Sequence, residues 1–491
     1  MRQGPLAGRY PAAAAMVIFA LVPYLGLSAA LNPLTPIIGM QLHVSAQTMS
    51  LGFGMANAGY AVGTVLAVQL SQLLPQRRMM VLYAALLVAG SILAAAATNG
   101  AMFITGHVLQ GLCTSLLLIA AVPPLALGFG LAKLRWTAMI MNVCIFGAVA
   151  LGPVIGGVQA GANAWRPLFW GVAGISIAAL LLTLLTFEDS PPADPSAPRD
   201  AVAIGLAAVG CAAAFFGASE LLTHRIIGTL TLLPLLGGLA LIVILVVYQY
   251  RSSRPLLTVQ TMLTSTVPIA GIVVALSAAA ASVAATVLTA DELAPRYTPA
   301  HLGVLYLPEL GGALLTAVAL GAVLKRRELH YLPLAGMVFL AAGIGVFRIE
   351  LPPSQALALV GSGLTGIGLG AAVAPALFVA GFSLHAASLQ RVFAIVELFR
   401  AVAAFMLAPL FVYFAATVGG GTGIALWIAF GLAVGGAVIA VLLYLLGNAR
   451  PQAPDLELFL SGEGAAWHSP PLLDAIRNRP LGAHAEEAMQ S

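Results

Sequence analysis

The sequence predicts an all-α polytopic membrane protein with fourteen transmembrane helices, arranged as two six-helix bundles plus two inserted helices. Composition is the first reason: the 491 residues are 60% hydrophobic and only 8% charged, and the mean hydropathy is +1.01. A soluble globular protein is about one quarter charged. The second reason is that the apolar residues gather in runs of about 20, the length at which a helix crosses roughly 30 Å of hydrocarbon.

Six apolar runs occupy the first part of the chain, and we assign residues 1–190 to an N-terminal six-helix bundle. The runs lie at residues 12–31, 48–70, 79–98, 102–122, 136–160 and 166–187. The first run follows Arg2 and Arg9 and ends in small residues, as a secretory signal does. It is too long for a typical signal core and thirteen more runs follow it, so we expect it to be retained as a helix.

A segment rich in proline and aspartate, residues 188–200, separates this bundle from the rest of the chain. Two runs follow it, and we assign residues 191–265 to a linker with two additional transmembrane helices, 201–220 and 229–250. Residues 266–447 are assigned to a C-terminal six-helix bundle, with runs at 267–290, 301–324, 331–350, 356–382, 392–417 and 422–446. Residues 448–491 are polar and interrupted by proline, which predicts a cytoplasmic tail that is disordered or docked on the surface.

The basic residues predict the orientation of the helices. With the N-terminus in the cytoplasm, sixteen Lys and Arg fall on the cytoplasmic side and only four fall outside, namely Arg166, Arg225, Arg296 and Arg348. This bias follows the positive-inside rule, so we expect both termini in the cytoplasm and the chain in the cell's inner (plasma) membrane. The 21 basic residues form no concentrated patch, so a nucleic acid is not expected as a partner. Glu220, Asp291, Glu292 and Glu350 lie at predicted outer helix ends, where we expect them to be solvated.

The sequence offers no chemistry of an enzyme. Its three cysteines fall within apolar runs at an odd count, which predicts no disulfide or metal framework. The segment GSGLTG, residues 361–366, matches the dinucleotide pattern GxGxxG, but it lies within an apolar run, so its glycines favour helix packing. No catalytic triad, metal-ligand spacing or phosphate loop occurs. We therefore expect neither catalysis nor a bound cofactor.

The most specific motif lies in the fifth run, where residues 147–157 read GAVALGPVIGG. Gly147, Gly152, Gly156 and Gly157 are its glycines; the last three leave one helix face without side chains, while Pro153 bends the helix. Close packing alone is one interpretation of this pattern. The other is that it resembles the antiporter motif of the major facilitator superfamily.

Other segments resemble the fourteen-helix drug:proton antiporter branch of that superfamily (EmrB/QacA-like), in order along the chain to about residue 447. They are NPLTPI at residues 32–37, HVLQG at 107–111, AWRPLFW at 164–170 and YRSSRPLL at 250–257. The two halves also resemble each other weakly, since AVQLSQLLPQRR (residues 67–78) and GAVLKRR (residues 321–327) close equivalent runs. Parallel repeats of this kind build one large class of transporters. Arg77 and Arg78 are then candidates for a cytoplasmic gating loop.

The resemblance implies the major facilitator fold and proton-coupled efflux of a small amphipathic or lipophilic molecule by alternating access. The expected partners are a small-molecule substrate, protons and the lipid bilayer, and a periplasmic adaptor protein is implied by the resemblance alone. Two alternatives stay open. One is a proton-coupled or facilitative importer of a small molecule, and the other is a non-transporting membrane scaffold or sensor.

Departures from the family pattern leave the coupling residue open. Leu27 stands where the family usually has an acidic residue in the first helix. Gln72 and Pro75 stand where the loop between the second and third helices usually carries Asp and Gly. His107 stands where the fourth helix usually has an arginine. Coupling must then come from ionisable residues at membrane depth, each of which costs about 2.5–3.5 kcal/mol on insertion scales unless paired or solvated.

Four residues qualify as coupling candidates. Glu309 lies about eight residues into the tenth run, roughly 12 Å from its outer end and near the midplane, either as a proton carrier or as a hydrogen-bonded core carboxyl. Glu397 and Arg400 are three apart and share a helix face, either as a coupling site or as a structural ion pair. His107 is either a proton carrier or a satisfied hydrogen-bonding residue. With Asn32 and Gln110, it is also predicted to line the substrate cavity.

Overall fold

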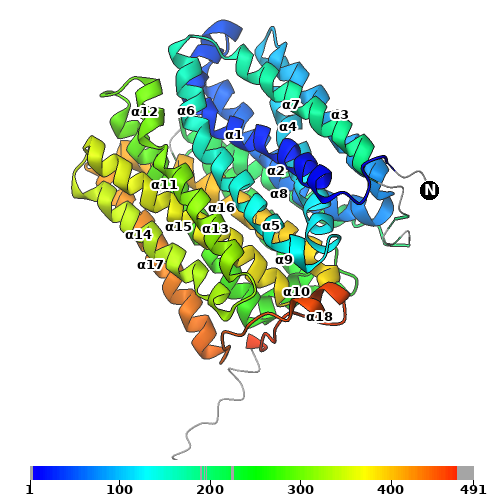
Figure 1. Ribbon diagram of the computed structural model, residues 1–491. Helices are drawn as coiled ribbons and strands as arrows, with labels where there is room; N and C mark the ends of the chain where they lie inside the picture. Colours follow the sequence, from blue (N-terminus) through cyan, green and yellow to red (C-terminus); the bar gives the residue numbers. More distant parts are fainter. Residues whose placement is uncertain (1–3, 188–190, 193, 195, 223–225, 473–491) are drawn as a thin grey trace, which may run out of the picture.

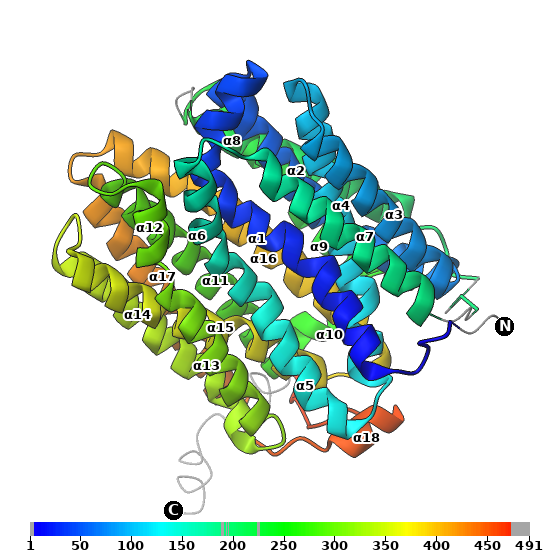
Figure 2. The same cartoon turned by 45° about the horizontal axis from the view of Figure 1, so that its top comes forward.

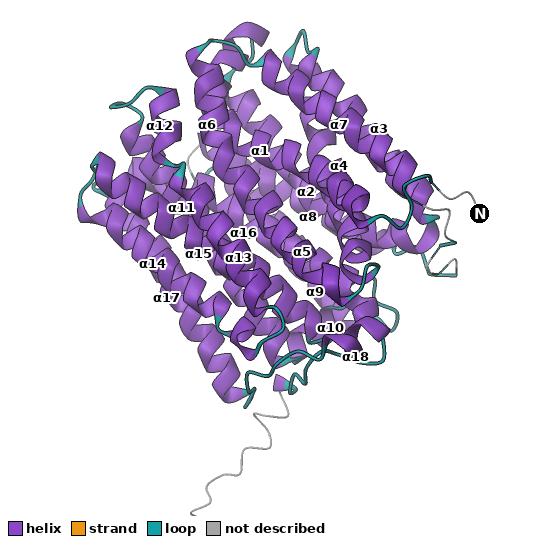
Figure 3. Cartoon of the chain, in the orientation of Figure 1, coloured by secondary structure: helices purple, strands orange, loops and turns teal. Residues whose placement is uncertain are grey.

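The computed structural model describes residues 4–187, 191–192, 194, 196–222 and 226–472. Within these residues, all the named secondary-structure elements are helices (Figure 1, Figure 3). The described residues contain fourteen spans that are long and apolar enough to cross a membrane, which confirms the predicted all-α polytopic fold. The first nine helices are α1 (Tyr10–Leu42), α2 (Ala46–Leu73), α3 (Gln76–Ala95), α4 (Gly100–Leu127), α5 (Leu131–Asn142), α6 (Ala148–Gly161), α7 (Arg166–Thr186), α8 (Ala201–Ser219) and α9 (Thr229–Arg251).

The remaining helices complete the chain. They are α10 (Val259–Thr264), α11 (Thr266–Leu293), α12 (Pro299–Leu305), α13 (Pro308–Val323), α14 (Leu332–Ile349), α15 (Gln355–Phe382), α16 (Leu389–Thr417), α17 (Gly421–Leu446) and α18 (Leu456–Ser461). A π-helical turn joins α5 to α6, and short 3₁₀ turns occur at Glu220–Leu222, Arg327–His330 and Ala386–Ser388.

The helices pack into two groups with a helix pair beside the first (Figure 1, Figure 2). In the first group, α1–α7, α2 and α3 pack on α4, α1 packs on α6 and α7, and α3 packs on α7. In the second group, α11–α17, α11 packs on α15, α16 and α17, and α14 packs on α15. Helices α8 and α9 pack on each other, and α8 packs on α2. The domain boundaries at residues 190, 265 and 447 stay a prediction.

The loops gather at two ends, which we name by their residues. The basic end carries Arg77, Lys133 and Lys325, and the opposite end carries His43 and Tyr297. Among the described lysines and arginines in loops or at helix ends, those at the opposite end are Arg166, Arg296 and Arg348. Arg2, Arg225, Arg477, Arg479 and His224 lie outside the described residues. Which end faces the cytoplasm stays a prediction.

The first helix is longer than predicted. It continues from residue 31 to Leu42 through Pro33 and Pro36. Proline is tolerated in membrane helices where neighbouring groups satisfy the freed backbone. The sequence NPLTPI therefore lies inside a helix.

Two spans are interrupted where a single helix was predicted. The fifth contains the π-helical turn Val143–Gly147, between α5 and α6. The tenth breaks after α12 at Tyr306 and Leu307, directly before Pro308. Pro308 has no amide hydrogen, so it cannot continue the i→i−4 hydrogen bonds of the helix, which accounts for the break. Glu309 therefore lies in the first turn of α13 and not within a continuous helix.

The inserted pair is fixed to the first group through α2. The Gln47 side chain donates to the Glu220 carboxylate at 3.1 Å near the opposite end. Near the basic end, the Asp200 amide donates to Gln69 at 2.8 Å, and the Gln249 side chain donates to the Asp200 carboxylate at 2.7 Å. The expectation that Glu220 is solvated was wrong, because its side chain is 3% exposed against α2.

The described part of the C-terminal tail is docked on the basic end, and α18 lies beside α5 (Figure 2). Leu456, Phe459 and Trp467 are buried against the helices. Of the two predicted states of the tail, residues 448–472 adopt the docked one. Residues 473–491 lie outside the described part.

Candidate functional site: a central cavity between the helix groups

A cavity of about 300 Å³ lies between the two helix groups. Its walls come from α1, α2, α4 and α6 on one side and from α11, α13, α15 and α16 on the other. The apolar part of the lining includes Phe53, Phe146 and Phe405. The polar part consists of Ser28, Asn32, Asn57, His107, Ser282, Thr286, Glu309 and Thr365.

The cavity continues toward the opposite end. A second cavity of about 660 Å³ shares Asn32, Phe53 and Thr286 with the first and extends to Asp291 and Tyr297. Asn32 therefore lines both cavities, and its contact with substrate stays a prediction. The shared lining shows that the two cavities are neighbours, one in the middle of the bundle and one toward the opposite end.

Glu309 is the acidic residue in the lining of the central cavity. Its Oε1 accepts hydrogen bonds from the Thr286 hydroxyl at 3.2 Å and from the Thr365 hydroxyl at 3.5 Å, which come from α11 and α15. Within the described residues, its carboxylate makes no ion pair. Its place in the first turn of α13 puts the carboxylate at the positive end of the helix dipole, which favours negative charge.

Glycines of α13 and α15 let the backbones of these two helices pack closely beside Glu309. A Cβ atom on Gly366 would lie 2.5 Å from the Cα atom of Glu309, and one on Gly312 would lie 2.6 Å from the carbonyl carbon of Gly366. The segment GSGLTG, which contains Gly366, is thus helical and closely packed, as predicted. Its glycines bring the backbones of α13 and α15 together.

Glu397 and Arg400 form the predicted ion pair, away from the central cavity. The Arg400 Nη2 and Nε atoms lie 2.6 Å and 3.0 Å from the same carboxylate oxygen of Glu397. The Tyr60 hydroxyl of α2 donates to that oxygen at 3.2 Å. Neither charged residue lines the central cavity, and the exposed fractions are 2% for Glu397 and 7% for Arg400. This geometry supports the interpretation as a structural ion pair, which joins α16 to α2.

His107 lines the central cavity, but Gln110 does not. The His107 Nδ1 atom lies 3.1 Å from the Gln110 side-chain oxygen, and the Gln110 amide donates to the Ser91 hydroxyl of α3 at 3.1 Å. The prediction that Gln110 lines the cavity was therefore wrong. The two side chains do share a helix face, but the Gln110 side chain hydrogen-bonds to Ser91 of α3 and is fully buried between the helices.

The fifth-span motif makes tight contacts with two helices. A Cβ atom on Gly152 would lie 2.6 Å from the carbonyl oxygen of Gly26, and one on Gly156 would lie 2.8 Å from the Cα atom of Ala30, both in α1. Gly157 packs in the same way on Pro299, the first residue of α12. Gly147 has more room, since its nearest neighbour would be 3.3 Å away.

Pro153 extends these contacts to the second group. Its carbonyl oxygen lies where a Cβ atom on Gly303 of α12 would be only 2.5 Å away. The motif therefore joins α6 to the first group through α1 and to the second group through α12.

The two groups also meet at the basic end, through residues that the sequence did not single out. Ser71 of α2 donates to Gln390 of α16 at 3.0 Å, and the Gln390 amide donates to the Ile119 carbonyl of α4 at 3.2 Å. Further toward the middle of the bundle, Asn142 of α5 hydrogen-bonds to Thr316 of α13 at 3.2 Å.

The predicted gating arginines lie at the start of α3, in the first group. Arg77 and Arg78 lie in the first turn of α3, and Arg77 donates to the Leu184 carbonyl of α7 at 3.4 Å. Arg78 is exposed. Their role as a gating loop stays a prediction.

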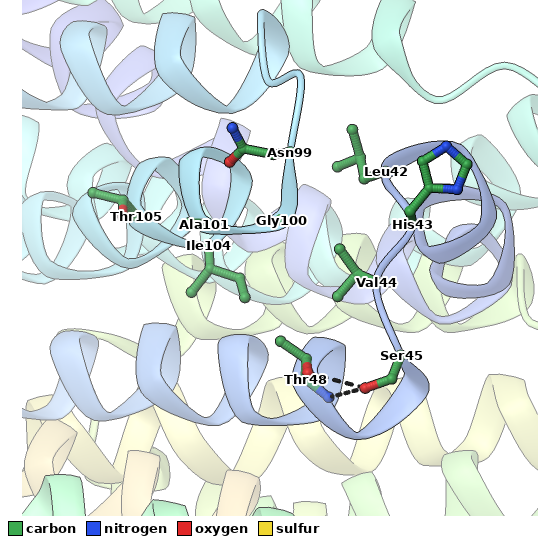
Figure 4. A pocket seen from close by; sticks show the side chains of 10 residues that line it. All are labelled: Leu42, His43, Val44, Ser45, Thr48, Asn99, Gly100, Ala101, Ile104 and Thr105. Atoms are coloured by element: carbon green, nitrogen blue, oxygen red, sulfur yellow. Dashed lines mark hydrogen bonds between the residues drawn. The ribbon is translucent and has the colours of Figure 1, made fainter.

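A groove of about 630 Å³ lies at the opposite end, between the turn after α1 and the start of α4 (Figure 4). Ser45 and Asn99 in its lining cap helices, since their side chains accept from the amides of Thr48 and Met102. These polar groups serve as helix N-caps, so we assign no function to this groove.

Comparisons with known proteins agree on the family. A sequence profile described as Major Facilitator Superfamily matches residues 16–323. A protein named multidrug resistance protein B homolog, from Mycobacterium tuberculosis, is 28% identical over 306 residues, which cover 58% of this chain and 54% of that protein. Multidrug resistance protein MdtL of Escherichia coli is 27% identical over 170 residues, covering 34% of this chain and 43% of that protein. The chain spans about half the length of the curated relatives it matches.

Solved structures share the fold. The crystal structure of peptide transporter POT in complex with sulfate has a TM-score of 0.61 at 16% identity and covers 90% of this chain and 96% of that one. The human organic anion transporter MFSD10 (TETRAN) has a TM-score of 0.60 at 13% identity and covers 88% of this chain and 99% of that one. Because the profile matches well over half of the residues and the fold is shared along most of the length, the chain belongs to the major facilitator superfamily of membrane transporters.

Proposed function

We propose that the protein exports a small amphipathic or lipophilic molecule in exchange for protons, with Glu309 as the residue that binds the proton. The observation that carries this proposal is the place of Glu309, whose carboxylate lines the central cavity and has two hydroxyl partners but no ion pair among the described residues. A charged carboxylate at membrane depth is costly unless it is paired or solvated. Its protonation therefore depends on what occupies the cavity beside it.

The lining of the central cavity supports an amphipathic cargo. Aromatic rings of Phe53, Phe146 and Phe405 provide apolar surface, and the hydroxyl and amide side chains provide a few hydrogen-bonding groups. Drug-sized ligands are recognised by this combination of apolar walls and a small number of polar groups. Relatives named as multidrug resistance proteins point to the same class of substrate.

The exchange follows alternating access. The two helix groups rock about the central cavity, so that Glu309 faces one side of the membrane and then the other. We place the protein in the inner (plasma) membrane with the basic end in the cytoplasm, because the basic residues gather there. A periplasmic adaptor remains part of the proposal only through the family resemblance. We favour export over import because the fifth-span motif resembles that of antiporters.

Substrate-induced proton release from the purified protein tests the proposal. The substrate for the assay is the compound to which a deletion strain becomes most sensitive in a panel screen. Glu309→Gln keeps the shape of the side chain and imitates its protonated form, so we expect it to bind substrate and release no proton. Glu350→Gln is the matched control, because Glu350 is exposed at the opposite end, and we expect release as in the wild type.

Three results would contradict the proposal. Unchanged proton release in Glu309→Gln would exclude Glu309 as the coupling residue. Loss of release in His107→Gln alone would move the coupling site to α4. Uptake that a protonophore abolishes, in place of efflux, would favour the importer.

A further inference from the structure

We propose that residues 450–471, which we call the tail strap, clamp the two helix groups together at the basic end and stabilise the conformation in which that end is closed. The strap is anchored on the second group and reaches α5 of the first (Figure 2). This role does not depend on which molecule or ion is transported.

The first anchor of the strap lies at the start of α11. The Thr266 amide donates to the Pro470 carbonyl at 3.1 Å, and the Val267 amide donates to the Ser469 hydroxyl at 3.0 Å. The first amides of a helix have no partner within the helix. The side chain of Ser265, the residue before α11, makes no capping hydrogen bond. The strap therefore caps α11 in place of a local residue.

The second anchor lies at the end of α15. The Ala466 amide donates to the carbonyl of Phe382, the last residue of α15, at 2.8 Å. The Trp467 ring packs on the His330 ring with 4.3 Å between centroids, and the Phe459 ring packs on the Phe382 ring at 5.1 Å. Trp467 is 4% exposed and Phe459 is 0% exposed. These two aromatic side chains supply the apolar burial that holds the strap on the second group.

Hydrogen bonds within the strap fix the position of α18. The Asp455 amide donates to the Ala466 carbonyl at 2.7 Å, and the Asp455 carboxylate accepts from the Leu458 amide at 3.0 Å. Because α18 is held between these two points, it moves with the second group. The contact between α18 and α5 therefore crosses from one group to the other.

The contacts near the strap are those that must open for cargo to reach the cavity from the basic end. Helices α5 and α13 meet close by, where a Cβ atom on Gly321 would lie 2.5 Å from the Met139 sulfur. The Ser71–Gln390 hydrogen bond joins the groups at the same end. The Asn142–Thr316 hydrogen bond joins them further toward the middle of the bundle. Rocking of the groups separates α5 from α13, and it must also pull α18 away from α5.

Cysteine labelling of the purified protein tests the strap. A single cysteine is placed at Ser71→Cys after Cys113, Cys144 and Cys211 have been replaced by alanine, and its rate of reaction with a hydrophilic maleimide is measured without substrate. We expect Trp467→Ala and truncation after Arg450 to raise this rate by about fivefold or more, the lower end of typical coupling between distant sites. Cleavage of the tail by protease in Trp467→Ala confirms that the strap is released.

Matched controls separate the strap from the tail as a whole. His468→Ala changes the exposed neighbour of Trp467, and truncation after Leu472 removes only residues outside the described part; both should label at the rate of the parent. If Trp467→Ala does not fold, as judged by gel filtration, the truncation after Arg450 decides. A released strap with an unchanged labelling rate would overturn the proposal, and so would equal increases in both truncations.

Discussion

The contact between Gly156 and α1 makes a quantitative prediction. In Gly156→Ala, the new Cβ atom would lie 2.8 Å from the Cα and carbonyl carbon atoms of Ala30 and closer still to its carbonyl oxygen. Carbon atoms pack best at about 3.5–4.0 Å, so α6 and α1 must separate by about 1 Å. The obstructing atoms are backbone atoms, which no side-chain rotation can remove. Overpacking of this kind costs about 1–3 kcal/mol.

Two measurements check this prediction. The midpoint of thermal unfolding of the purified protein should fall in Gly156→Ala, and transport should fall even where the protein reaches the membrane in normal amount. Gly161→Ala in the same helix is the control, since a Cβ atom there meets nothing within 4 Å and both quantities should stay unchanged. Wild-type unfolding and transport in Gly156→Ala would refute the close-packing argument, because the added methyl group would then have found space that the structure does not contain.

Three further predictions concern topology, the buried ion pair and the tail. A cysteine at Lys325 should react with an impermeant reagent from the cytoplasmic side and one at His43 from the other side, and labelling of both from one side would contradict the fourteen-span topology. Glu397→Gln leaves the buried guanidinium of Arg400 without a counter-charge and should cost about 3–5 kcal/mol, seen as loss of folded protein on gel filtration, whereas a double variant with Arg400→Leu should recover part of the yield. Burial under the docked tail lowers the pKa of His330 from 6.5 to about 4. As the pH falls from 6.5 to 4, His330 is therefore protonated when the tail is undocked but not when it is docked, so docking becomes weaker. Protease cleavage of the tail should rise over that range, and cleavage that is independent of pH would contradict the docked geometry.

The number and position of the spans could be predicted from the sequence because hydropathy reports which segments the membrane accepts. All fourteen predicted runs are helical in the structure. Hydropathy does not report whether a helix is continuous, however. The interruption at Tyr306 and Leu307 and the extension through Pro33 both involve proline, and the outcome depends on whether neighbours satisfy the freed backbone.

The cavity was predicted only in part. Asn32, His107 and Glu309 stood out because polar residues are rare in apolar helices, and all three line the central cavity. Thr286 and Thr365 could not be recognised, because a hydroxyl in a membrane helix commonly bonds its own backbone. The Thr365 hydroxyl shares its one proton between the Glu309 carboxylate and the Ser362 carbonyl, which lies at 2.9 Å.

The buried ion pair also has one partner that the sequence could not indicate, because that partner is far away along the chain. Glu397 and Arg400 are three residues apart, so their pairing follows from helix geometry. Tyr60, which bonds both, is 337 residues from Glu397 in the sequence. Such a contact depends on how the two helix groups meet, and no local pattern reports it.

The π-helical turn at Val143–Gly147 makes the length of the fifth span as important as its composition. Asn142, before the turn, contacts α13, whereas Gly152 and Gly156, after it, contact α1. A turn widened by one residue changes the phase of all later side chains by about 100° relative to an uninterrupted helix. Deleting one residue from the turn would therefore rotate one of these contact faces away from its partner, although every residue of the glycine motif would still be present.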